Sequence, residues 1–325
     1  MEAVEQKAAL RRVIRSDVAV VIGSVLAICL LLGQISTGFT SAYNLSSLAR
    51  TIAVTALVGF SQLFALSIGH FNLALGAMGA IGAVLAAALM MVYNLPIWVA
   101  IVAGLLAGVL AGAIQGWLIV KTSINPFVIT LSLASIYLGG LTALTQAKFF
   151  DALPEAFNRI GNTNLIGLPV MLLTTLIIAV GLWTLVARTP LGRQLLAVGA
   201  NPVAATFAGI PTDAITIFAH TMSGLLAAAA GILLAARLNV AQISIGTDWM
   251  LMSFAAPVLG GTILSGGKVS VVETIFGAAL MSLITNMLVV LGVNFFWFQT
   301  FLGFILLGAY ALDRARLSYL SQTKA

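Results

Sequence analysis

Long apolar stretches make up most of the chain, and short polar or glycine-rich connections separate them. Each stretch approaches the ~20 residues that a helix needs to cross a bilayer, and none shows the regular alternation of a membrane strand. Backbone groups in lipid must be satisfied internally, which favours helices. The pattern predicts an all-α, polytopic bundle of about ten membrane-spanning helices, over residues 18–35, 49–68, 72–92, 96–120, 126–146, 168–187, 213–236, 249–263, 270–291 and 295–312.

Composition supports an integral membrane protein. Of the 325 residues, 61% are hydrophobic and 7% are charged, whereas soluble domains carry roughly 25% charged residues. The mean hydropathy is +1.13. Little chain remains for a soluble domain, so residues 1–325 are expected to form a single transmembrane domain.

Two glycine-rich segments interrupt apolar runs at comparable depth. Residues 69–76 (GHFNLALG) and 260–267 (GGTILSGG) share three identities at a common offset, and each precedes another apolar run. Transporters built from internal repeats place broken helices near the membrane midplane. The two segments therefore predict broken helices and suggest an internal duplication.

Glycines also recur at helical spacing inside two of the expected spans. Small residues on one face allow membrane helices to approach closely, so we expect tight helix packing around these positions. They are Gly76, Gly79 and Gly82 in one span, and Gly104, Gly108 and Gly112 in the next.

Positive charge is distributed unevenly between the two sides of the predicted membrane protein. The net charge is +6, and with an even number of spans most Lys and Arg residues fall on one side. The positive-inside rule then places both termini and residues 188–212 in the cytoplasm and residues 147–167 outside. Membrane orientation accounts for the basic charge without a nucleic-acid partner. Residues 147–167 form a long outer loop with mixed charges and three phenylalanines. This loop either lies on the membrane surface, docks a soluble partner or is solvated.

Residues 188–212 have the pattern of a partner-binding element. The segment 201–209 (NPVAATFAG) predicts a short helix with an Asn cap, Pro at the first helical position and a Gly exit. Residues 192–200 predict an amphipathic neighbour. An exposed apolar face rimmed by charge usually meets a partner, although an interfacial helix lying on lipid fits the same pattern.

The same segment resembles the cytoplasmic coupling loop of ribose-type ABC importer permeases. The likeness continues in family order through residues 125–140, 246–280 and 291–316. It implies a bacterial inner-membrane permease that binds no cofactor itself and works with ATP- and Mg-binding ATPase subunits. It also implies a periplasmic solute-binding protein, a second permease subunit and surrounding lipid. The positions that match the coupling pattern are Gly192, Arg193, Ala197, Gly199, Asn201, Ala204, Ala205, Gly209 and Ile210.

Residues 69–77 correspond to a family segment that here departs from its usual pattern. His70 stands in place of glycine, Asn72 in place of aspartate and Ala74 in place of serine. A carboxylate at membrane depth is costly, and the low charge of the spans suits a neutral cargo such as a monosaccharide or polyol. His70 either hydrogen-bonds a neighbouring carbonyl or lines the path. The candidate path residues are His70, Phe71, Asn72, Asn125, Phe127, Thr262 and Asn286.

Other functions have less support. Residues 260–270 lack the glycine and the Ser/Thr that a phosphate-binding loop requires around Gly267 and Lys268. No metalloprotease or serine-hydrolase motif occurs, so the chain is not expected to be an enzyme. The alternative is a secondary transporter or facilitator for a small neutral solute. Proton coupling is disfavoured because Asp213 and Glu273 fall near the ends of spans.

Overall fold

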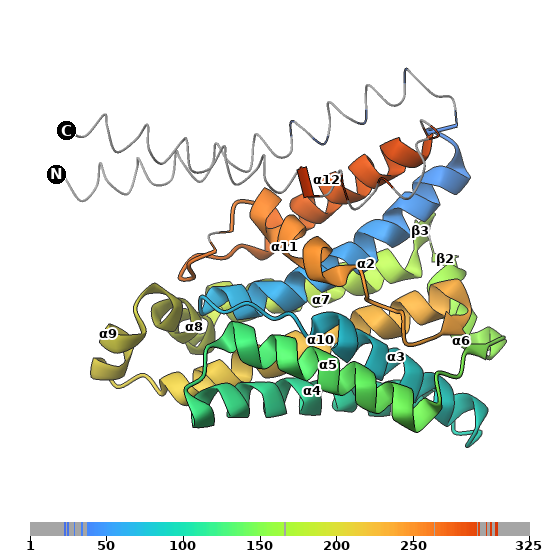
Figure 1. Cartoon of the computed structure of the whole chain (residues 1–325). Coiled ribbons are helices and arrows are strands. Elements are labelled where there is room, and N and C mark those ends of the chain that lie inside the picture. The colour runs from blue at the N-terminus through green and yellow to red at the C-terminus, as the bar shows by residue number, and fades with distance from the viewer. Residues whose placement is uncertain are drawn as a thin grey trace.

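The computed structural model describes residues 38–290 apart from 166 and 263, together with a few isolated positions on either side. Most of this region is helical (Figure 1). The elements are α2 (Ala42–Ser67), α3 (Leu75–Met91), α4 (Ile97–Thr122), α5 (Pro126–Thr145), β1 (Phe150–Asp151), α6 (Glu155–Asn162), β2 (Asn164–Leu165), β3 (Leu168–Pro169), α7 (Val170–Arg188), α8 (Pro190–Ala200), α9 (Pro202–Phe207), α10 (Thr212–Leu238), β4 (Val240–Ala241), α11 (Trp249–Leu259) and α12 (Val271–Val290).

The helices agree with eight of the ten predicted apolar segments. Six described helices, α2, α4, α5, α7, α10 and α12, are long and apolar enough to cross a membrane, and α3 and α11 are shorter apolar helices. The first and last predicted segments, 18–35 and 295–312, lie almost wholly outside the described residues. A polytopic helical membrane protein is therefore supported, and the total of ten spans stays a prediction.

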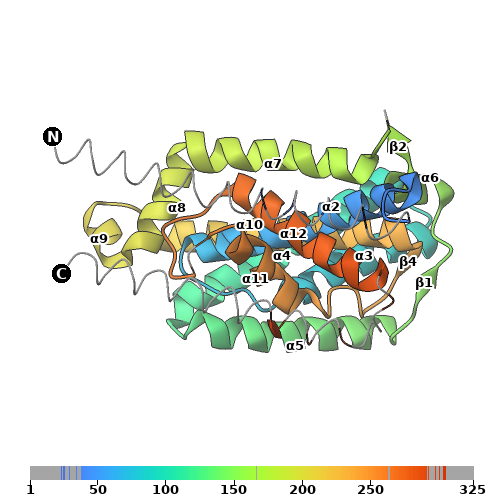
Figure 2. The same cartoon turned by 90° about the horizontal axis from the view of Figure 1, so that it is seen from above.

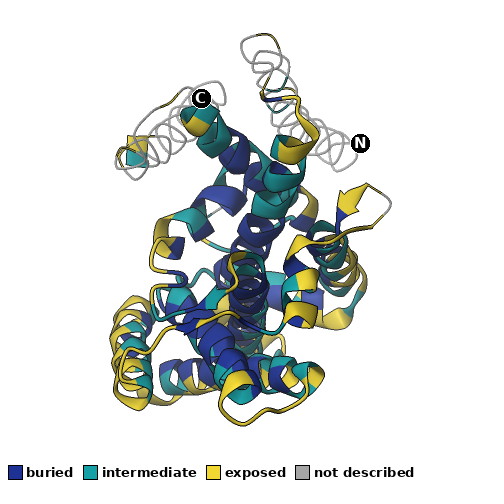
Figure 3. Ribbon diagram, turned by 90° about the vertical axis from the view of Figure 1, so that its right-hand side faces the viewer, coloured by how far each residue is buried: buried dark blue, intermediate teal, exposed yellow. Residues whose placement is uncertain are grey.

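Helix α10 occupies the centre of the bundle. It packs against α2, α3 and α4, while α5 and α7 run along opposite flanks (Figure 2). In the most apolar window of α2, 78% of residues are buried, against 22% in α5 and α7. Figure 3 shows the same division, with buried residues inside and exposed residues on the outer helices. The outer apolar faces of α5 and α7 are thus available to lipid.

Glycine allows the central helices to approach each other. An added Cβ on Gly108 would lie 2.5 Å from the Gly224 carbonyl oxygen, and one on Gly224 would collide with the Gly108 carbonyl oxygen. The same holds for Gly82 against Ala228, where the added Cβ would be 2.9 Å from Cα. The close packing predicted from the glycine spacing is confirmed for α3, α4 and α10.

The two ends of the bundle differ. Helices α8 and α9 lie at one end, which we call the α8 end, and α6 with the strands lies at the other, the α6 end (Figure 1). At the α6 end β1 pairs with β4 and β2 pairs with β3, both antiparallel. These two-residue strands were not predicted, because such short pairings leave no periodic pattern in the sequence.

Part of the segment 147–167 packs into the helix bundle. Phe150 and Phe157 are 5% and 1% exposed, and α6 packs against α7 and α10. Gly161 lies so close to the Ala236 and Arg237 backbone that an added Cβ would clash. The interpretation of the whole segment as a solvated loop is therefore wrong, although Phe149 remains 64% exposed.

Gly224→Ala is predicted to destabilise the bundle. Its methyl group would meet the Gly108 carbonyl and lie 3.0 Å from the Gly112 nitrogen, so two backbones must move apart. Overpacking of this kind costs about 1–3 kcal/mol, and the thermal midpoint in detergent should fall. Gly139→Ala is the control, since nothing lies within 4 Å of an added Cβ there. Equal midpoints for the two variants would contradict the packing described.

Candidate functional site

A buried break separates α2 from α3. The chain leaves the helix at Ile68, turns through Gly69 at φ +74° and resumes a helix at Leu75. Asn72, in the middle of the break, is fully buried. Irregular backbone at membrane depth is tolerated where it is buried in protein or lines a cavity. The predicted interruption at residues 69–76 is confirmed, and protein surrounds its centre.

Asn72 is held by hydrogen bonds within the protein. Its Nδ2 donates to Ser223 Oγ of α10 at 2.8 Å, and its Oδ1 accepts from the Ala74 backbone nitrogen at 2.9 Å. With the Gln62 amide oriented to satisfy both of its groups, that amide bonds the Asn72 backbone at 3.0 and 3.2 Å. The side chain of Asn72 therefore fixes the break to α10, and its backbone fixes the break to α2. Its contact with solute stays a prediction.

His70 is part of a chain of polar side chains. His70 Nδ1 lies 3.2 Å from His220 Nε2, and His220 Nδ1 lies 2.8 Å from Gln115 Nε2. An amide nitrogen only donates, so His220 accepts at Nδ1 and donates from Nε2 to His70. These hydrogen bonds join the break to α10 and α4. The expected bond from His70 to a neighbouring carbonyl is thus replaced, among the described residues, by a bond to another imidazole.

Sequence reasoning missed the partners of the break. Gln62, Gln115, His220 and Ser223 are all fully buried. Each is a polar side chain inside an otherwise apolar span, and such residues usually face the bundle interior and bond across helices. That signal was available, but the contacts it produces depend on tertiary packing.

The remaining path candidates lie at the first break with the start of α5, in the break between α11 and α12, and in α12. At the first break, the Phe71 ring contacts Phe254 with centroids 5.5 Å apart, and Thr130 of α5 donates to the Phe71 carbonyl at 3.2 Å. Asn125 caps that helix through a 2.9 Å bond from the Phe127 nitrogen.

Thr262 lies in the break between α11 and α12, where it is 5% exposed and its hydroxyl has no hydrogen-bond partner among the described residues. Asn286 pairs with Asn44 toward the α6 end through amide bonds of 2.9 and 3.2 Å. The structure thus groups residues 70–72 with the start of α5 and leaves Asn286 apart.

The second predicted interruption, residues 260–267, lies against the first. The Gly267 nitrogen donates to the Ser67 carbonyl at 3.1 Å, and an added Cβ on Gly69 would be 2.9 Å from the Ser265 oxygen. Gly266 and Gly267 have φ values of +90° and +79°, a region that favours glycine. The two breaks are therefore neighbours in space. The suggested duplication of sequence stays a prediction.

Helices α8 and α9 form a projection, which we call the handle. Thr189 caps α8 with Pro190 at its start, and Asn201 caps α9 through a 3.0 Å bond from the Ala204 nitrogen. Gly209 follows with φ +77°. The predicted short helix, its cap and its glycine exit are confirmed.

The handle has an inner and an outer face. Gly192, Leu195 and Val198 are buried on α8, and Ala205 is 4% exposed on α9. Arg193 is exposed. Ala205 therefore packs the handle together and does not present its side chain to a partner.

The most exposed large apolar side chains of the handle are instead Val203 and Phe207, which are 65% and 89% exposed. The matching pattern in the sequence did not separate these two faces, because it includes packing residues and surface residues alike.

The end of α8 makes backbone contact with both breaks. An added Cβ on Gly199 would collide with the Ser67 carbonyl oxygen, and one on Gly266 would be 3.0 Å from the Gly199 oxygen. A Cβ added to Gly267 would be 2.9 Å from the Cα of Ala200. We call Ser67, Gly69, Gly199, Gly266 and Gly267 the glycine junction. It joins the handle to the two irregular segments without intervening side chains.

Comparison with known proteins identifies the family. The profile of the family described as "Branched-chain amino acid transport system / permease component" matches residues 44–310. The chain belongs to this family. No solved structure matches the chain.

Several relatives are permeases of sugar transport systems. The ribose import permease protein of Bacillus subtilis (strain 168) is 34% identical over 284 residues, which cover 87% of this chain and 88% of that protein. The L-arabinose transport system permease protein of Escherichia coli (strain K12) is 32% identical and covers 85% and 84%. The D-allose transport system permease protein of the same organism is 30% identical and covers 85% of both chains.

Gly199→Ala is predicted to open the glycine junction. A methyl group cannot fit beside the Ser67 carbonyl, so α8 must shift and weaken the bond from Gly267 to Ser67. Hydrogen–deuterium exchange should become faster in peptides covering residues 264–270. Gly181→Ala in α7, where an added Cβ meets nothing within 4 Å, should leave exchange unchanged. Unaltered protection in both variants would show that the contact is absent in solution.

Proposed function

We propose that this chain is the membrane-spanning permease subunit of an ATP-driven importer for a neutral monosaccharide or related polyol. The observation that carries the proposal is the similarity, over about 85% of the chain, to permease proteins of ribose, allose and arabinose transport systems. The mixture of sugars among these relatives supports a monosaccharide class and does not select one member. The same relatives speak against a free-standing secondary transporter or facilitator.

The handle is the proposed docking element for a cytoplasmic ATPase. Val203 and Phe207 expose apolar surface on α9, and Arg193 is exposed on the neighbouring α8. An apolar surface with charge at its rim usually meets a protein partner. ATP and Mg would be bound by that ATPase. In this proposal the shape of the handle depends on Gly192, Ala197 and Ala205. The start and end of α9 are set by Asn201, Ala204 and Gly209.

The α8 end is proposed to face the cytoplasm of a bacterium whose inner membrane holds the protein. Within the described residues the basic side chains divide equally, with four toward this end (Lys121, Arg188, Arg193 and Lys268) and four toward the α6 end (Arg50, Lys148, Arg159 and Arg237). The excess comes from the seven Lys and Arg residues of the two terminal segments, which an even number of spans places with the α8 end. The positive-inside rule favours the cytoplasm for the richer side. Both termini are placed there by the same rule. A periplasmic binding protein would deliver solute at the α6 end, and a second permease subunit, identical or related, would complete the complex.

Transport is proposed to follow alternating access. ATP-driven closure of the ATPases would move the handle, and the glycine junction would pass that movement to both breaks. His70, Phe71 and Asn72 sit in the first break and Thr262 in the second, so a change in the position of the breaks would alter the path. Asn125 and Phe127, beside the first break, are the proposed inner end of that path.

Uptake by the reconstituted complex tests this function. Proteoliposomes containing the permease, its ATPase and its binding protein should accumulate D-ribose, D-allose or L-arabinose only when ATP is supplied. The double variant Val203→Glu, Phe207→Glu should lose both ATPase co-purification and uptake, because two carboxylates replace the apolar contacts.

The matched control changes an exposed aromatic residue at the other end of the molecule. Phe149→Glu alters a residue that is 64% exposed and should leave ATPase co-purification intact. Uptake that is equal with and without ATP would contradict the importer and support a facilitator. Full ATPase recovery by the double variant would show that the handle is not the docking element.

A further inference from the structure

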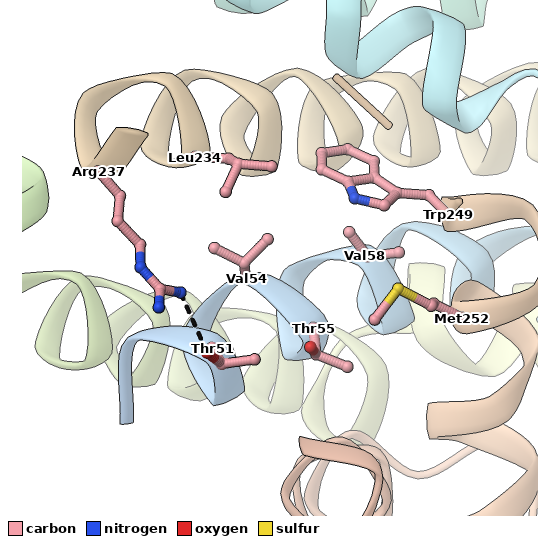
Figure 4. Close-up of a pocket in the computed structure, with 8 residues that line it drawn as sticks. All are labelled: Thr51, Val54, Thr55, Val58, Leu234, Arg237, Trp249 and Met252. Atoms are coloured by element: carbon pink, nitrogen blue, oxygen red, sulfur yellow. Dashed lines mark hydrogen bonds between the residues drawn. The ribbon is translucent and has the colours of Figure 1, made fainter. Parts of the chain in front are cut away.

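A small cavity lies between α2, α10 and α11, in the half of the bundle near the α6 end. Its volume is about 150 Å³, and a cavity of this size holds one six-membered ring such as benzene. Arg237 and Trp249 stand at opposite ends of it, with Val54 and Leu234 between them (Figure 4). None of the residues proposed above for the translocation path lines this cavity.

The two ends of the cavity carry hydrogen-bond donors with spare capacity. Arg237 bonds Thr51 Oγ1 at 3.1 Å and Ser47 Oγ at 3.2 Å. Among the described residues, no ion pair to Arg237 is found; the pair in α6 joins two other side chains. Trp249 is 5% exposed, and its indole N–H has no acceptor among the described residues.

A hydroxyl group lines the cavity between these ends. Thr55 Oγ1 accepts a long bond of 3.4 Å from Ser282 and donates no bond within the described region. Val54, Val58 and Leu234 supply apolar walls. Ligand pockets typically combine apolar walls with a few polar groups that orient the ligand, so the arrangement suits a ligand that brings several oxygen acceptors together with an apolar face.

A monosaccharide ring has this combination of groups. Its hydroxyls accept from a guanidinium and from an indole N–H at separate points on the ring, and its C–H faces pack on aliphatic or aromatic walls. A compact anion such as phosphate would satisfy Arg237 but would leave the Trp249 end without a partner. A disaccharide exceeds a volume of about 150 Å³.

We infer that this cavity is a binding subsite for a single monosaccharide ring, with Arg237, Thr55 and Trp249 as its hydrogen-bonding groups. The inference rests on the proposed function for the class of solute. It adds a site near the α6 end, where incoming sugar would first be held within the bundle.

Fluorescence of Trp249 tests the site directly. The full-length protein is prepared with Trp249 as its only tryptophan, by the substitutions Trp98→Phe, Trp117→Phe, Trp183→Phe and Trp297→Phe. Titration with D-ribose, D-allose and L-arabinose should give a saturable change in emission for at least one sugar. Sucrose should give none. Thr55→Val, which keeps the shape and removes the hydroxyl, should weaken the apparent affinity by up to about tenfold.

A second variant fills the cavity without removing a polar group. Val54→Phe extends into the space between Leu234 and Arg237 and should abolish the response while the thermal midpoint is retained. Val180→Phe, on a face of α7 where Val180 is 62% exposed, is the matched control and should respond like the parent. A response that persists in both Val54→Phe and Thr55→Val would overturn the inference, because the sugar would then bind elsewhere.

Two further outcomes separate this site from the proposed function. ATP-driven sugar uptake by the parental complex with no Trp249 response to any of the three sugars would remove the site and leave the importer standing. A Trp249 response without ATP-driven uptake would support the site and contradict the importer. A response to inorganic phosphate alone would also overturn the inference, because it would identify an anion site.

Discussion

The backbone contact between Gly199 and the two broken segments is the constraint on which the proposed coupling depends. A Cβ at position 199 would overlap the Ser67 carbonyl, and Gly267 donates to that same carbonyl at 3.1 Å. Flexible side chains could absorb a displacement of α8, but three backbones in direct contact cannot. Movement of the handle must therefore displace the ends of both breaks or separate the junction.

The first break is in turn fixed to the centre of the bundle. Asn72 bonds Ser223, and His70 bonds His220, so two residues of one break are tied to a single helix. Helix α10 begins directly after the handle and runs to the Arg237 end of the cavity. One helix thus touches the handle, the break and the cavity. This continuity provides a physical route between the proposed ATPase docking element at one end and the proposed sugar subsite at the other.

The sequence was sufficient for the elements whose signals are local. Apolar length predicted the long helices, and the order Asn201, Pro202, Gly209 predicted α9 with its cap and exit, because capping depends on neighbouring residues. Glycine spacing predicted close packing but not the partner of each glycine. The pairing of His70 with His220, residues 150 positions apart in the chain, required the fold. So did the burial of Ala205 and the cavity beside Trp249, because both depend on which helix faces are brought together.

The most direct test of the account is a pair of distances measured between spin labels in the assembled complex. In a Cys29→Ser background, one pair of cysteines at Thr206 and Lys268 reports on the handle and the second break. A pair at Thr206 and Asn164 reports on the handle and the α6 end. If the glycine junction moves as one unit, ATP leaves the first distance distribution unchanged and shifts the second. A first distance that changes with ATP as much as the second would contradict this coupling.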